Sequence, residues 1–184
     1  EKRFKEIKKK IKKKIFLNKN ALVVGGSSGL GEITVKILCA LGANVIFTYK
    51  KNFFNPKKIT SDLKKKKIVC NFFKFDVTKI KKKDINFFKY KKFETIFYYS
   101  TPKIVATDTF NKNLYKNYLN YYVLSFKKLL KIIERVSKNK TKIFFPSTIY
   151  IDQKNKNFSE YIEAKNKAEN LCNSINKKNN LKYS

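Results

Sequence analysis

Histidine is absent from this 184-residue sequence, and cysteine is scarce. Without an imidazole the chain cannot use a Ser-His-Asp or Cys-His catalytic arrangement, and it lacks the side chain that most transition-metal sites employ. The three cysteines, Cys39, Cys70 and Cys172, are odd in number, widely spaced and free of any CxxC pair. They therefore indicate neither a disulfide framework nor a zinc site, and we expect no metal centre.

Long apolar runs are also lacking. None approaches the ~20 apolar residues of a membrane-spanning helix, and no signal peptide is visible. Together with the cysteine usage, this predicts a soluble protein of the reducing cytoplasm. Methionine is missing as well, even at the first position, so we expect Glu1 to be a processing boundary or a cut from a longer polypeptide.

Arginine is nearly absent although the formal net charge is +31. Only Arg3 and Arg135 of the 44 basic residues are arginines. Proteins that read nucleic acids usually employ arginine, whose guanidinium reaches bases and phosphates with two hydrogen bonds at once. The lysines occur beside abundant Asn, Ile, Phe and Tyr, all of which A- and T-rich codons can encode. We therefore attribute the charge to composition and expect no specific nucleic-acid partner.

The order of apolar and helical segments predicts an α/β fold. Residues 1–17 are expected to be a lysine-rich leading helix or linker, and residues 18–184 one domain. Strands are predicted at residues 21–24, 44–50, 67–77, 93–100 and 141–148, and helices at 30–42, within 52–67, at 113–136 and at 159–175. This alternation is typical of βαβ units in a Rossmann-like, doubly wound parallel sheet. Five strands are expected, and a sixth could begin at "LKYS".

A glycine-rich turn follows the first predicted strand. Its GxxxGxG spacing allows a tight turn, a close approach of a pyrophosphate to the backbone amides and close packing of the next helix. The candidate cofactor-binding residues of this turn are Gly25, Ser27, Ser28, Gly29, Leu30 and Gly31. In a parallel sheet, ligands bind beyond the carboxyl ends of the strands, where this turn is expected. The alternative is a tight strand-to-helix turn without a ligand.

The stretch "VVGGSSGLGE" resembles the TGxxxGxG cofactor loop of the short-chain dehydrogenase/reductase family, with Val24 where a threonine is usual. The resemblance extends from residue 20 to about residue 184 and implies an NAD(P)-binding domain. An acid after the second strand would suit NAD, whereas a base suits the 2′-phosphate of NADP. Here Tyr49, Lys50 and Lys51 follow, and the next acid is Asp62, so we expect NADP, with NAD as the alternative.

A further cofactor contact is implied by "FDVT". Asp76 and Val77 resemble the Asp-Val pair that contacts adenine in this family. A plain aspartate at the end of a strand is the alternative interpretation.

The family's catalytic signature, YxxxK, occurs three times, about as often as chance gives in a chain so rich in both residues. The pairs are Tyr99–Lys103, Tyr150–Lys154 and Tyr161–Lys165. The chemistry needs both side chains on one helical face, which positions i and i+4 share. Tyr99 is expected in a strand that Pro102 ends, and Tyr150 at the close of the fifth strand. Only Tyr161 opens a strongly helical run.

The resemblance implies the catalytic roles. Tyr161 would donate its proton to a carbonyl oxygen as hydride arrives, while Lys165 would hold the ribose and lower the pKa of Tyr161. A hydroxyl should polarise the carbonyl, and "FFPST" offers both Ser147 and Thr148, with the spacing slightly favouring Thr148. A strand-end turn after Pro146 is the alternative for both residues.

The family's structural asparagine corresponds by distance to Asn120, although another alignment places Tyr122 there. Where the family commonly has NNAG, this chain has "YYSTPKI", and it ends where the sixth strand would begin.

These features together predict an NADP(H)-dependent short-chain oxidoreductase that acts on a small-molecule carbonyl or alcohol. We expect a homo-oligomer formed through the long helices. The departures from the family pattern define the alternative, a catalytically inactive dinucleotide-binding scaffold or sensor.

Overall fold

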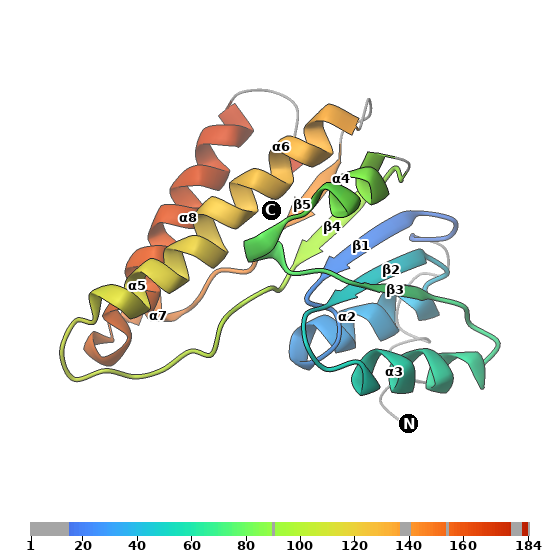
Figure 1. Cartoon of the computed structure of the whole chain (residues 1–184), viewed down its shortest axis with the longest axis horizontal. Coiled ribbons are helices and arrows are strands. Elements are labelled where there is room, and N and C mark those ends of the chain that lie inside the picture. Colours follow the sequence, from blue (N-terminus) through green and yellow to red (C-terminus); the bar gives the residue numbers. More distant parts are fainter. Residues whose placement is uncertain (1–14, 90, 137–140, 154, 178–181, 184) are drawn as a thin grey trace. The chain divides into compact units, whose positions relative to one another are not determined.

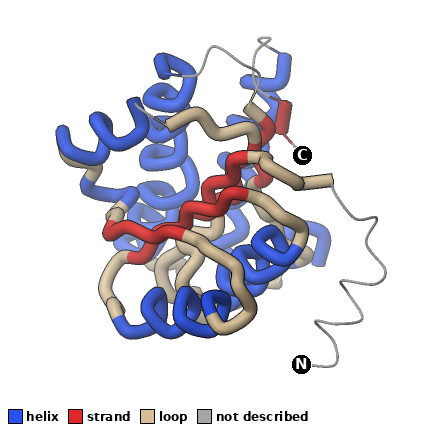
Figure 2. Tube along the Cα trace, turned by 90° about the vertical axis from the view of Figure 1, so that its right-hand side faces the viewer, coloured by secondary structure: helices blue, strands red, loops and turns tan. Residues whose placement is uncertain are grey.

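The computed structural model describes residues 15–89, 91–136, 141–153, 155–177 and 182–183 (Figure 1). Most of the predicted leading segment, residues 1–14, lies outside the described residues. The chain forms two compact units: a first unit of residues 1–75 and 93–99, and a second unit of residues 76–92 and 100–184. Helices and strands alternate along much of the described chain, and Figure 2 shows the helices in blue and the strands in red.

The first unit contains a parallel sheet in the order β3-β2-β1-β4. Its strands are β1 (Asn20–Val24), β2 (Asn44–Tyr49), β3 (Asn71–Lys74) and β4 (Thr95–Tyr98), and its helices are α2 (Gly29–Ala40) and α3 (Phe54–Lys64). β1 lies between β2 and β4, and residues 21–24 are all buried. This burial explains why the strand is continuously apolar rather than alternating.

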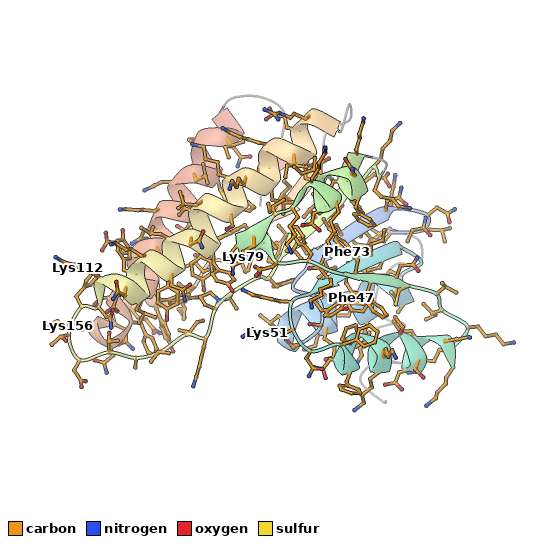
Figure 3. The ribbon with its side chains drawn as sticks, viewed as in Figure 1. Phe47, Lys51, Phe73, Lys79, Lys112 and Lys156 are labelled. Atoms are coloured by element: carbon orange, nitrogen blue, oxygen red, sulfur yellow. The ribbon has the colours of Figure 1, made fainter. Side chains whose placement is uncertain are left out.

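Both helices of the first unit pack against this sheet (Figure 1). Val35 of α2 and Leu63 of α3 belong to one buried apolar cluster with Phe47 of β2, which Figure 3 labels between the sheet and the helices. Gly42 has a φ of +84°, a conformation that ends a helix without steric penalty for glycine. Residues 41–43 therefore lead directly from α2 into β2.

The second unit is mostly helical. It contains the helices α4 (Lys82–Lys89), α5 (Lys112–Leu119), α6 (Phe126–Val136), α7 (Tyr150–Gln153) and α8 (Ser159–Lys177), the 3₁₀ turns η1 (Val77–Lys79) and η3 (Lys156–Phe158), the π-helical segment η2 (Asn120–Ser125), and the parallel strands β5 (Lys142–Phe144) and β6 (Lys182–Tyr183). α5 and η2 pack along α8 (Figure 1). None of the described helices is long and apolar enough to cross a membrane.

The α/β architecture with parallel strands is confirmed, and all five predicted strands are present. The third is shorter than predicted, because Lys67 adopts a left-handed φ of +58° and Asp76 already caps the turn that follows. The long helix predicted at residues 113–136 is present, but η2 interrupts its α-helical hydrogen bonding.

The prediction that Tyr150 closes the fifth strand is wrong. β5 ends at Phe144, and Pro146 has no N–H group with which to extend the sheet. Tyr150 instead begins the single-turn helix α7, in which the N–H of Ile151 donates to the carbonyl of Thr148 at 3.3 Å.

Candidate functional site

Two hydrogen bonds hold the glycine turn against the end of β2. The N–H of Gly25 donates to the hydroxyl of Thr48 at 3.0 Å, and the N–H of Gly26 donates to the Thr48 carbonyl, also at 3.0 Å. Gly25 adopts a φ of +78°, which favours glycine at this position. The buried Thr48 thus holds the first half of the turn in place.

The other two glycines of the GxxxGxG pattern are required for different reasons, one for its backbone conformation and one for lack of space. Gly29 has a φ of +54°, yet a Cβ atom there would meet nothing within 4 Å. A Cβ atom on Gly31 would lie 2.2 Å from the carbonyl oxygen of Gly25, far inside contact distance. Gly31 therefore allows α2 to begin close against the turn, as its place in the pattern predicts.

The start of α2 has the properties of an anion-binding site. The N-terminal N–H groups of a helix have no partner within the helix, and the helix dipole makes this end positive. Ser28, Gly29 and Leu30 are exposed here, and among the described residues the Ser28 side chain caps no N–H group. Glu32, the acid of the first turn, pairs with Lys36. These features fit a phosphate group of a dinucleotide.

The residues expected to face the cofactor's ribose lie in two different environments. Tyr49 is buried, and its ring centroid lies 5.8 Å from those of both Phe53 and Phe72, which places Tyr49 in an aromatic cluster. Lys50 is half-buried, and Lys51, labelled in Figure 3, is exposed after β2. The lysines are therefore better placed than Tyr49 to meet a 2′-phosphate.

Asp76 and Val77 belong to the second unit. A carboxylate oxygen of Asp76 accepts hydrogen bonds from the N–H and the hydroxyl of Thr78, at 3.0 and 2.6 Å, and caps η1. Val77 is buried. The contact of this pair with adenine stays a prediction.

Tyr161 and Lys165 lie one turn apart on α8, as the helical context predicts. Both are buried, Tyr161 with 7% of its surface exposed and Lys165 with 4%. The ring of Tyr161 meets those of Tyr118 and Tyr122 edge-on, with centroids 5.7 and 5.8 Å away. The two candidate catalytic side chains therefore share one largely aromatic environment.

The ammonium group of Lys165 is enclosed by aromatic rings. Its Nζ atom donates to the carbonyl of Pro146 at 2.6 Å and lies 4.4 and 4.6 Å from the ring centroids of Tyr122 and Phe145. The ring of Tyr161 is 5.9 Å away. Burial lowers the pKa of Lys165 to about 8, although the nearby Glu169 carboxylate raises it.

Thr148 and Ser147, the two candidate polarising hydroxyls, have different partners. Burial raises the pKa of the Tyr161 hydroxyl, and a hydrogen bond with the Thr148 side chain lowers it in part. The exposed Ser147 hydroxyl instead donates to the carboxylate of Glu169. The two candidate hydroxyls therefore have different partners, and which of them polarises a carbonyl stays a prediction.

The π-helical segment η2 holds both candidates for the structural asparagine position. The amide oxygen of Asn120 accepts a hydrogen bond from the hydroxyl of Ser125 at 3.3 Å. The Tyr122 hydroxyl is hydrogen-bonded to that of Thr101, and burial raises its pKa. Tyr122, rather than Asn120, packs on both Tyr161 and Lys165. Short π segments are frequent at functional sites, which suits this position.

The other two YxxxK tyrosines lie in different surroundings. The hydroxyl of Tyr99 accepts a hydrogen bond from that of Thr34 at 2.9 Å. Tyr150 stacks on Phe158, with centroids 4.8 Å apart, and its partner in the pattern, Lys154, lies outside the described residues.

Sequence reasoning missed the residue that precedes Tyr161. Glu160 is fully buried, and its two carboxylate oxygens accept from the hydroxyl of Thr107 at 3.0 and 2.9 Å. One of them also accepts from the backbone N–H of Asn111. The available signal was Asn111, a helix-capping residue type two positions before the predicted long helix. Its side chain accepts hydrogen bonds from the N–H groups of Asn113 and Leu114 at 3.0 Å.

Within the described residues, no three Cys, Asp or Glu side chains gather as a metal site would require.

Comparison with known families gives one match. Residues 19–91 match the model of the short chain dehydrogenase family. This segment includes the glycine turn, the residues after β2 and the Asp76–Val77 pair. A comparison with curated proteins gives no match.

Solved structures with the same fold include several dehydrogenases. A short chain dehydrogenase of Salmonella enterica serovar Typhi has a TM-score of 0.79 at 14% identity, over 94% of this chain and 76% of that one. The oxidoreductase yciK of Escherichia coli has a TM-score of 0.79 at 16% identity, over 93% and 75%. FolM alternative dihydrofolate reductase 1 of Brucella suis, solved with NADP, has a TM-score of 0.77 at 11% identity, over 92% and 71%.

Fold and motifs define a Rossmann-like α/β protein. The resemblance to the short-chain dehydrogenase/reductase family is confirmed over residues 19–91 by the family match, and the solved structures share the fold of the chain.

Proposed function

We propose that this chain is an NADP(H)-dependent oxidoreductase of the short-chain dehydrogenase/reductase type that interconverts a small-molecule carbonyl and its alcohol. One observation carries the proposal: on α8, the buried Tyr161 lies one turn before a buried lysine, Lys165, whose Nζ atom is 5.9 Å from the centroid of the Tyr161 ring. A proton donor, a carbonyl-polarising hydroxyl and a cation are the protein groups that carbonyl reduction by hydride transfer requires.

The first turn of α2 is proposed to hold the pyrophosphate of the dinucleotide. The N–H groups of Gly29, Leu30 and Gly31 point out of the helix end, and the exposed Ser28 adds a hydroxyl. Lys50 and Lys51 would pair with the 2′-phosphate, which favours NADP over NAD. The nicotinamide, when bound, supplies or accepts the hydride.

Tyr161 is the proposed proton donor. Burial raises the pKa of its hydroxyl, so the phenol keeps its proton at neutral pH and can donate it to a carbonyl oxygen. The Thr148 hydrogen bond stabilises the phenolate that remains. Lys165, with a pKa of about 8, is mostly protonated at pH 7, and its charge stabilises the same phenolate.

The direct test follows NADPH oxidation over a panel of aldehydes and ketones. Replacing Tyr161 by Phe removes the proton donor and retains the ring that packs on Tyr118. We expect kcat/KM to fall roughly 100-fold or more, the usual contribution of a positioned acid, while NADPH binding is retained.

Tyr99→Phe is the matched control, because Tyr99 also begins a YxxxK motif but directly follows β4 in the first unit. We expect this variant to retain wild-type activity. A Tyr161→Phe variant as active as the wild type would contradict the mechanism. NADPH binding without oxidation over the whole panel would favour the alternative of a dinucleotide-binding scaffold or sensor.

A further inference from the structure

Tyr122, in the π-helical segment η2, contacts three groups of the candidate site. Its ring centroid lies 4.4 Å from the Nζ atom of Lys165 and 5.8 Å from the ring centroid of Tyr161. Its hydroxyl is hydrogen-bonded to the hydroxyl of Thr101, in the segment that follows β4. Only 1% of the surface of Tyr122 is exposed, so these contacts are made away from water.

Neighbouring rings support the ring of Tyr122. Tyr118, one turn earlier, stacks on it with centroids 6.0 Å apart and an angle of 9° between the ring planes. Phe145, directly after β5, meets it edge-on with centroids 6.5 Å apart. Positions i and i+4 share a helical face, which explains why Tyr118 and Tyr122 both meet Tyr161. Contacts with two rings and the bond to Thr101 therefore fix the orientation of the Tyr122 ring.

The buried ammonium of Lys165 is stabilised by uncharged groups. Its Nζ atom donates to the carbonyl of Pro146 and lies over the rings of Tyr122 and Phe145. Burial removes water from an ammonium, which is unfavourable unless other groups stabilise the charge. The negative face of an aromatic ring attracts a cation, and this attraction is stronger away from water. The ring of Tyr122 therefore favours the charged form of Lys165.

We propose that Tyr122 is a positioning residue of the reductase site, whose ring keeps the ammonium of Lys165 charged and in place beside Tyr161. This rests on the proposed function, in which the charge of Lys165 stabilises the phenolate of Tyr161. The ring also connects the segments after β4 and β5, because Tyr122 is bonded to Thr101 and Lys165 to the carbonyl of Pro146. In a parallel sheet, such segments at the carboxyl ends of strands surround the ligand.

The contribution of Tyr122 must be separated from that of the other titratable groups near Lys165. Glu169 and Cys172, both on α8, also favour the charged form. Tyr161 lies on the same helix, with its ring centroid 5.9 Å from the Nζ atom. Fluorine atoms on an aromatic ring withdraw electrons from its face and weaken its attraction for a cation, with little change in size. Fluorination at position 122 therefore leaves these three groups in place.

The test measures the pKa of Lys165 by NMR in the full chain, with lysine labelled at its ε-carbon. The resonance of Lys165 is the one that titrates near pH 8 and is missing from Lys165→Met. Position 122 carries phenylalanine, as Tyr122→Phe, or phenylalanine with one, two or three fluorine atoms on its ring. We expect the pKa to fall with each added fluorine, by about one unit over the series.

The same series at position 118 is the matched control. The ring of Tyr118 also packs on Tyr161, but among the described residues Lys165 lies over the rings of Tyr122, Phe145 and Tyr161, and not over that of Tyr118. The pKa of Lys165 should stay constant in this series. The proposal would be overturned by a pKa that ignores fluorination at position 122, or by one that falls equally in the two series.

Kinetics connect the ring to the reaction. The pH at which kcat/KM declines on the alkaline side should fall together with the pKa of Lys165, because the proposed reaction needs the charge of this lysine. A merely structural change would lower kcat/KM at every pH and leave this midpoint in place. If the chain oxidised no NADPH with any carbonyl, the proposed function would fail, whereas the NMR titration would still decide whether Tyr122 keeps Lys165 charged.

Discussion

Glu160 and Thr107 are joined by two hydrogen bonds, from one hydroxyl to both oxygens of a fully buried carboxylate. The same carboxylate accepts from the N–H of Asn111. It thereby ties the segment before α5 to the first turn of α8, the turn that contains Tyr161. A buried carboxylate needs such partners, because an unpaired buried charge is strongly unfavourable.

Removing this carboxylate should destabilise the protein. Glu160→Ala leaves the N–H of Asn111 and the hydroxyl of Thr107 without their acceptor, and we expect a loss of about 2 kcal/mol in the free energy of unfolding. Urea denaturation measures the change. Glu163→Ala, on the same helix but half-exposed, is the control and should cost about 0.5 kcal/mol. Equal losses from both variants would argue against the special role of Glu160.

The Glu160 carboxylate also predicts how the stability of the protein changes at acidic pH. Burial alone would raise the pKa of Glu160, but hydrogen bonds from Asn111, from its own backbone and from Thr107 outweigh it and hold the pKa below its usual value. The carboxylate therefore contributes stability that is present above the unfolded pKa and is lost as the pH falls through the folded pKa. In urea titrations between pH 6 and 3, roughly the range of a carboxyl group, the wild type should lose more stability than Glu160→Gln. Parallel curves would exclude this contribution.

Lys165 predicts a gain of stability with rising pH in the alkaline range as well. Burial lowers its pKa to about 8, so between that pH and the unfolded pKa the unfolded chain binds more protons than the folded one. Stability should therefore rise with pH in this window, relative to a Lys165→Met variant that cannot titrate. We expect a relative gain of about 1–3 kcal/mol from pH 8 to 10. If the difference in the free energy of unfolding between the two proteins stayed constant over this pH range, the pKa of Lys165 would not be lowered by folding.

Gly29 and Gly31 form a matched pair for the glycine turn. Gly29→Ala adds a Cβ atom into open space but keeps a left-handed φ, and should cost about 1 kcal/mol of stability. Gly31→Ala forces a Cβ atom against the carbonyl oxygen of Gly25 and should cost about 3 kcal/mol or displace the turn. NADPH binding by calorimetry should weaken far more in the second variant. If NADPH binding weakened equally in both variants, it would not depend on the close packing of α2 against the turn.

Thr148 and Ser147 are neighbours with different predicted contributions to catalysis. Thr148→Val keeps the shape but removes the hydroxyl that lowers the pKa of Tyr161, and should lower kcat/KM by roughly 100-fold. Ser147→Ala removes a hydroxyl that binds Glu169 on the surface and should leave kcat/KM within about twofold. Steady-state kinetics with the best carbonyl substrate distinguishes the two. The reverse ranking would reassign the polarising hydroxyl to Ser147.

The sequence was informative where local geometry depends on neighbouring residues. The glycine spacing predicted the turn after β1, and the i to i+4 spacing placed Tyr161 and Lys165 on one helix. Spacing favoured Thr148 over Ser147 only slightly, because the partners of the two hydroxyls depend on how the chain turns after Pro146.

The contacts of Glu160 could not be predicted from the sequence for a related reason. Its partners Thr107 and Asn111 lie 53 and 49 residues earlier in the chain, and no periodic pattern links them to it. Tyr150 was misplaced because its apolar neighbours suggested a longer strand, whereas Pro146 leaves the sheet without a donor at that point.

The π-helical segment has a consequence for insertions and deletions. A π turn bonds residue i to i+5, so Asn120–Ser125 accommodates one residue more than an α-helix would over the same rise. Successive residues of an α-helix are rotated by about 100°, so losing one residue elsewhere would turn the buried Leu129 and Ile133 away from the core. Losing one residue within η2 would instead convert the wide turn into a regular one. The long helix can therefore lose one residue within η2, where Tyr122 packs on Tyr161, and keep the orientation of its later residues.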